Sequence, residues 1–98
     1  MEKANEKMYI VRCKNAGVFF GEVVKSDAES VEMKNVRKLW YWDGACAVEQ
    51  LAMDGVANPD DCKFTVVVPS MILESACQII QCTDKAIESL KGVKVWRR

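Results

Sequence analysis

The residues with the clearest capacity for chemistry lie in one short run at positions 37–44, RKLWYWDG. Two of the chain's three tryptophans and one of its two tyrosines occur here, directly after two basic residues. Indole rings stack on heterocyclic bases and on one another, and a neighbouring lysine or arginine attracts phosphate. The run is therefore typical of a core keystone, a self-association surface or a ligand-binding shelf.

Alternate side chains of a β-strand share a face, so Trp40 and Trp42 are expected on one face together with Lys38. Arg37, Leu39 and Tyr41 are then expected on the opposite face. A cation beside two indoles suits a ligand that carries both a phosphate and a heterocycle. The same residues also fit a solvated strand start, with the indoles packed in a core or an interface.

Two further residues belong to the predicted site. Arg12 shares a face with Ile10 and is expected to be an edge charge or a ligand contact. Phe19 and Phe20 are adjacent, so one is expected in the core and the other against a helix or a partner surface, which favours self-association. The predicted ligand-binding residues are Trp40, Trp42, Lys38, Arg37, Tyr41, Arg12 and Phe19.

Other chemistry is poorly represented in the chain. There is no histidine, and the five cysteines (13, 46, 62, 77 and 82) form no CxxC pair. Zinc sites and histidine-based acid–base or nucleophilic catalysis are therefore not expected, and no glycine-rich phosphate loop is present. Asp60 and Asp61 lie in a proline turn without a calcium-loop pattern. The sequence predicts no enzyme, no metal site and no cofactor.

The composition fits one globular domain. The chain has 98 residues, half of them hydrophobic, and a formal net charge of +0. A neutral protein has no global field to collect nucleic acid, and the longest apolar runs are too short to cross a bilayer. Residues 1–7 are charged and are expected to form a disordered tail rather than a secretory signal. We expect a cytoplasmic protein with a single domain at residues 8–98.

Local patterns indicate the elements that position the aromatic run. Strands are expected at residues 9–13, 18–24, 31–34, 36–42, 62–68 and 71–82, with a final edge strand at 93–96. Asn35 is expected to mark a turn or bulge, and Gly21 a bulge or a close backbone approach. A helix of about ten residues is expected between Asp43, as its N-cap, and Gly55. A second helix, capped by Thr83 and Asp84, is expected to run through Leu90. This order predicts an α+β domain: a curled or barrel-like antiparallel sheet with two short helices.

The aromatic run and its flanks, KNVRKLWYWDGA at residues 34–45, resemble the hallmark of a family of small uncharacterised phage and prophage proteins. Similar segments recur at residues 16–22, 50–52, 58–59, 62–64, 83–89 and 95–96, so the resemblance covers residues 8–96. It implies a phage-encoded protein acting in the bacterial cytoplasm, but carries no established function. By analogy, one group of small phage proteins forms oligomers that sequester nucleotide immune signals.

Three function classes remain open from the sequence. The first is a non-catalytic protein that self-associates and binds a small anionic ligand, such as a nucleotide signal of host defence. The second is a protein–protein module in which the same aromatic residues block a host factor. The third, single-stranded nucleic-acid binding, fits the alternation of aromatic and basic residues but not the net charge.

Overall fold

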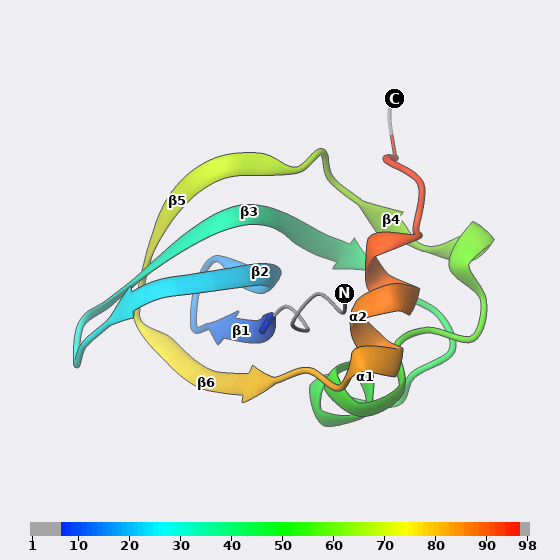
Figure 1. Ribbon diagram of the computed structural model, residues 1–98, viewed down its shortest axis with the longest axis horizontal. Helices are drawn as coiled ribbons and strands as arrows, with labels where there is room; N and C mark the ends of the chain where they lie inside the picture. The colour runs from blue at the N-terminus through cyan, green and yellow to red at the C-terminus, as the bar shows by residue number, and fades with distance from the viewer. Residues whose placement is uncertain (1–6, 97–98) are drawn as a thin grey trace, which may run out of the picture.

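The computed structural model describes residues 7–96, which form one antiparallel sheet and two helices (Figure 1). A three-stranded meander comprises β1 (Tyr9–Cys13), β2 (Gly17–Ser26) and β3 (Ser30–Tyr41). The later strands are β4 (Lys63–Phe64), β5 (Val68–Glu74) and β6 (Ala76–Gln81). The helices are α1 (Val48–Asp54), the 3₁₀ turn η1 (Pro59–Asp61) and α2 (Asp84–Lys91). The predicted α+β class is confirmed. Most of the predicted tail, residues 1–7, lies outside the described part of the chain.

The sheet curls because two consecutive strands pair with opposite sides of the meander. β5 pairs with β3, whereas β6 pairs with β1, and a single residue, Ser75, separates them. Ser75 takes a positive φ of 61°, accepts a hydrogen bond from the amide of Lys14 and donates one to the carbonyl of Glu29. It therefore links the loops at the ends of both hairpins. The predicted curl is present, but the sheet does not close into a barrel.

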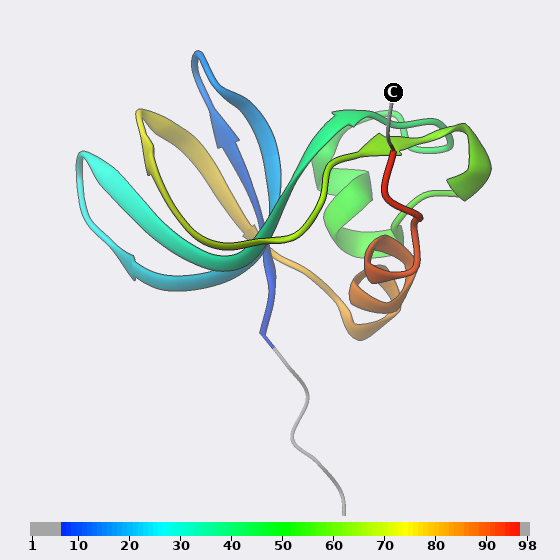
Figure 2. The same cartoon turned by 90° about the horizontal axis from the view of Figure 1, so that it is seen from above.

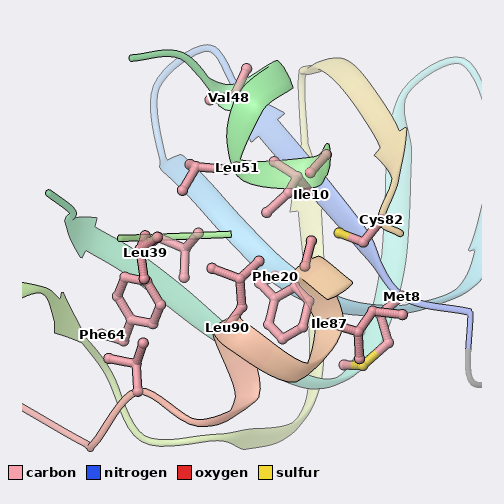
Figure 3. Packing of buried hydrophobic residues seen from close by; sticks show 14 of the residues in the cluster. Met8, Ile10, Phe20, Leu39, Val48, Leu51, Phe64, Cys82, Ile87 and Leu90 are labelled. Carbon is pink, nitrogen blue, oxygen red and sulfur yellow. The ribbon is translucent and has the colours of Figure 1, made fainter. Parts of the chain in front are cut away.

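Two hydrophobic cores lie on opposite faces of the sheet. The helix-side core brings Ile10, Phe20 and Leu39 against both helices (Figure 3). The other, the strand-side core, contains residues from strands alone, among them Val11, Phe19, Met33 and Leu73. Figure 2 shows the curled strands on one side and the two helices grouped on the other.

The pair Phe19 and Phe20 illustrates this division. Both are buried, Phe19 in the strand-side core and Phe20 in the helix-side core. The expectation that one of them faces a helix is correct, because Phe20 lies beside Ile87 and Leu90 of α2. The inference from this pair to a self-association surface loses its basis, since neither ring is exposed.

The pairing of β2 with β3 contains a bulge at a position that the sequence indicates. Asn35 has a φ of 50°, and the β2–β3 register shifts at this point, between Phe20 and Glu22. The intervening Gly21 is so close to β3 that an added Cβ would lie 2.8 Å from the Cα of Val36. Of the alternatives expected from the sequence, Asn35 thus marks a bulge rather than a turn, and Gly21 a close backbone approach.

Asp43 is not the N-cap of α1. The helix begins at Val48, its N-cap is Ala47, and the Gln50 side chain accepts a hydrogen bond from the amide of Cys46 at 2.9 Å. Asp43 instead accepts from the side-chain amide of Asn58 at 3.3 Å. Gln50 thus satisfies an amide that precedes the helix, and Asp43 holds the returning loop.

The later elements match the prediction in part. The strand expected at 62–68 is reduced to β4. Pro69 lies inside β5, which is tolerated because, among the described strands, β5 pairs with β3 on one side only, and a proline on the unpaired side needs no amide donor. The strand expected at 71–82 is divided at Ser75. Thr83 caps α2 as predicted, its hydroxyl accepting from the amide of Ala86 at 3.1 Å. Only an isolated parallel bridge, Phe64 to Val95, represents the expected edge strand.

Candidate functional site: an exposed aromatic surface

The end of β3 contains a bulge that groups aromatic side chains around a lysine. Leu39 pairs with Phe64 of β4 and Tyr41 pairs with Lys63, so two residues of β3, Trp40 and Tyr41, lie opposite Lys63. The extra residue breaks the alternation of faces. Lys63 Nζ lies 5.2 Å from the centroid of the Trp40 ring system and 5.9 Å from that of Tyr41.

Trp96 reaches this group through backbone pairing with β4. Its amide donates to the carbonyl of Phe64 at 2.9 Å, next to the bridge between Phe64 and Val95. The ring system of Trp96 stacks on that of Trp40, with centroids 4.9 Å apart and planes inclined by 11°. Lys63 Nζ is 5.3 Å from the Trp96 ring centroid. We call these four residues, Trp40, Tyr41, Lys63 and Trp96, the aromatic surface.

The aromatic surface is accessible and carries one cation. Trp40 is 55% exposed and Tyr41 is 50% exposed, although large aromatic side chains are usually more buried. Stacked indoles held by a cation–π contact form a rigid platform. Such a platform can stack a further planar ring and attract a negative group. It contains no pair of groups arranged for acid–base or nucleophilic chemistry.

Trp42 does not share a face with Trp40, contrary to the expectation from strict alternation. β3 ends at Tyr41, and Trp42 is half-buried against the helix-side core. The bulge opposite Lys63 causes this change, because one extra residue moves every later side chain to the other face.

Arg37 is buried rather than exposed as a ligand contact would be. It shares the helix-facing side of β3 with Leu39, as predicted, but is only 3% exposed. Its Nε donates to the carbonyl of Thr65 at 3.0 Å, and its Nη1 donates to the carbonyls of Leu90 and Val93 at 3.3 and 2.9 Å. Burial lowers the pKa of its guanidinium. Arg37 therefore ties β3 to the end of α2, where a cation also meets the negative pole of the helix.

The other predicted residues lie elsewhere. The Lys38 side chain lies beside Gly17, where an added Cβ would be 3.1 Å from Lys38 Cε. Arg12 is exposed and shares the helix-facing side with Ile10, but β1 pairs on both sides, so it is not an edge charge. Its Nη1 donates to Gln78 at 3.5 Å, and Gln78 donates to Glu49 at 3.1 Å. Of the seven predicted residues, the structure brings Trp40 and Tyr41 together.

Two residues of the aromatic surface are missing from the sequence-based site. Lys63 occurs in an ordinary β-rich run, and Trp96 follows a helix near the end of the described chain. The signal that could have indicated Trp96 is its rarity, as the third tryptophan of the chain, within an expected edge strand. Nothing in the local pattern around Lys63 distinguishes it from other lysines.

The cysteines form no metal site among residues 7–96, where no group of three or more ligating side chains lies together. Cys13, Cys62 and Cys82 are buried, whereas Cys46 and Cys77 are exposed. Burial raises the pKa of the Cys82 thiol from 9.0 to about 12. A thiol needs its ionised form to react, so this residue is protected both by burial and by its pKa.

We therefore expect iodoacetamide to modify Cys46 and Cys77 in the folded protein and the other three only after unfolding, as measured by mass spectrometry. Rapid native alkylation of Cys82 would contradict the packing around it.

Folding raises the pKa of the Cys82 thiol, so the free energy of unfolding depends on pH. The contribution of this thiol is present below the unfolded pKa of 9.0 and is lost as the pH rises toward about 12.

A comparison with protein families assigns the chain. Residues 6–90 match the model of a domain of unknown function, DUF6948. The chain belongs to this family. Membership of an uncharacterised family is thereby confirmed. The DUF6948 match contains Trp40, Tyr41 and Lys63, while Trp96 lies beyond it.

Searches of the curated proteins and of the solved structures found no match to this DUF6948 chain. Within residues 7–96, the DUF6948 structure has no helix that is both long and apolar enough to cross a membrane.

Proposed function

We propose that this DUF6948 protein is a non-catalytic binding protein whose aromatic surface takes a small anionic ligand with a planar ring, such as a nucleotide. The observation that carries the proposal is the exposed Trp40, stacked on Trp96 and contacted by Lys63. The ring of the ligand stacks on the indoles, and Lys63 attracts its phosphate or carboxylate.

The geometry favours binding because the platform is already assembled. A stacked base contributes about 1–3 kcal/mol, and sites that need no rearrangement lose less affinity to ordering. Lys63 lies almost equally far from both indole centroids, at 5.2 and 5.3 Å, so its charge is held where a ligand would stack. Among the described residues, the aromatic surface contains one cation, Lys63, which suits the single anionic group of a small ligand.

The resemblance to phage and prophage proteins supplies the biological part of the proposal. A binding protein without catalysis can act by sequestration, and the concrete version is removal of a nucleotide signal that activates host defence in the bacterial cytoplasm. Self-association, proposed from the aromatic excess in the sequence, would multiply the sites in each particle. Size-exclusion chromatography with light scattering tests it: a monomer at all concentrations would remove self-association from the proposal.

Trp40→Ala is expected to weaken nucleotide binding at least about fivefold, because it removes one stacking partner. The measurement is a thermal-shift and calorimetric titration of the wild type with a panel of cyclic and linear nucleotides, followed by the variant with the best binder. Lys63→Gln should weaken binding and also flatten its dependence on salt. Ile72→Ala is the matched control, since Ile72 is an exposed apolar residue of β5 outside the aromatic surface.

The outcomes separate the function classes. No stabilisation by any nucleotide would reject the ligand proposal, and recovery of a host protein that Trp40→Ala releases would favour the interaction module instead. Binding of oligonucleotides with a steep salt dependence would favour a nucleic-acid binder. Equal nucleotide affinity of the wild type and Trp40→Ala would show that the ligand binds away from the aromatic surface.

A further inference from the structure

Arg37 carries a buried charge that the protein satisfies only in part. Its Nε and Nη1 donate to three backbone carbonyls, and its Cζ lies 5.2 Å from the centroid of the Phe64 ring. Its third nitrogen, Nη2, is buried and has no hydrogen-bond partner. Buried side-chain donors nearly always have partners, and this one belongs to a charged group.

Within residues 7–96, Arg37 forms no ion pair with a carboxylate. Glu22 pairs with Lys34 and Asp54 with Lys85 instead. The lowered pKa of Arg37 has burial as its cause, with no opposing contribution from an acid. The ring of Phe64 offers a cation–π contact but no acceptor in hydrogen-bond geometry. A buried arginine without an anion is costly, which makes its surroundings informative.

Arg37 borders a cavity of about 260 Å³. The other lining residues are Met8, Phe20, Glu22, Asn35, Val67 and Lys91. The cavity thus combines two cations with an apolar wall. Its one acid, Glu22, already has partners: it accepts from the Asn35 side-chain amide at 2.9 Å and lies 3.8 Å from Lys34 Nζ.

We infer that this cavity is a second binding site, distinct from the aromatic surface, for the oxyanion of a small molecule: a carboxylate or a phosphate group. One oxygen accepts from Arg37 Nη2, and the remainder of the molecule contacts the apolar wall. Because Nε and Nη1 are already engaged, the guanidinium binds through one nitrogen rather than as a two-pronged fork. The inference does not depend on the function proposed for Trp40 and Trp96.

The test is a titration of the full chain with inorganic phosphate and with acetate at constant ionic strength. Binding is followed by thermal shift and by NMR of the Asn35 side-chain amide and the Val67 amide. We expect saturable stabilisation by at least one of the two anions, with shifts concentrated at these two residues. Removing Arg37 itself would also remove its bonds to α2, so the informative variants lie at the cavity wall.

Val67→Phe adds bulk to the lining and leaves all three of Arg37's hydrogen bonds in place; it is expected to weaken anion binding at least about tenfold. Val66→Phe is the matched control, because Val66 is also exposed but does not line the cavity. Trp40→Ala should bind the anion as the wild type does.

Three results would overturn the inference. The first is the absence of saturable binding of either anion. The second is equal affinity in the Val67→Phe and Val66→Phe variants. The third is loss of anion binding in Trp40→Ala, which would assign the anion to the aromatic surface. Failure of the nucleotide panel alone would reject the proposed function and leave this second site standing.

Discussion

Phe20→Ala is expected to lower the free energy of unfolding by about 3–5 kcal/mol, and Phe19→Ala by a similar amount. Each ring is almost fully buried, and each lies in a different core. Removing either leaves a cavity in addition to the lost burial of the ring. Urea denaturation followed by circular dichroism measures both changes, and the fitted slopes show whether unfolding stays two-state.

Two comparisons make this prediction specific to the two-core arrangement. Val24→Ala on the same strand is the control, because Val24 is exposed and its truncation should change stability by less than about 0.5 kcal/mol. If Phe19 belonged to an interface rather than a core, its substitution would alter the oligomeric state and leave the monomer nearly as stable. Such a result would contradict the strand-side core.

Gly44→Ala is expected to destabilise the protein by about 3 kcal/mol, the second large effect. Gly44 has a φ of 98°, a backbone conformation that residues with a Cβ rarely adopt. An added Cβ would also lie 2.5 Å from the backbone nitrogen of Ala57. The neighbouring backbone cannot give way as a flexible side chain could. The segment that follows the aromatic run must therefore move away from the loop before η1.

Gly92→Ala provides the matched control for this substitution. Gly92 has a φ of −80°, and the nearest atom to an added Cβ is the carbonyl oxygen of Glu88 at 3.4 Å. Alanine at such a position should be neutral or stabilising by up to about 1 kcal/mol. Thermal or urea unfolding of the two variants side by side gives the comparison. Equal stability of both would mean that Gly44 is not held against Ala57.

The aromatic surface and the Arg37 cavity place the predicted chemistry in two locations. The sequence predicted Lys38 on the face of the tryptophans and Arg37 on the opposite face, both as candidate phosphate ligands. In the structure Lys63 takes the place beside Trp40, while Arg37 lies on the helix-facing side of the same strand. Within residues 7–96, a ligand on the aromatic surface therefore interacts with one cation, Lys63, and this contact should depend only modestly on salt.

The sequence by itself determined the elements whose signals are local. Thr83 caps α2, Gly55 ends α1, Asn35 bulges β3, and the alternation along β3 predicts the shared face of Arg37 and Leu39. Each of these features depends on backbone conformation or hydrogen bonds within a few residues, or on the period of a strand. Such information is present in any short window of the chain.

The tertiary structure alone decided which side chains meet at the end of β3. A two-residue strand, β4, creates the bulge that separates Trp42 from Trp40 and brings Lys63 into contact. Trp96, which is 56 positions from Trp40 in the chain, stacks on it because its amide donates a hydrogen bond to the carbonyl of Phe64. Pairing between distant segments leaves no periodic trace in the sequence, and one inserted residue reverses every face that follows it. For this reason the aromatic run could be recognised from the sequence, but its partners could not.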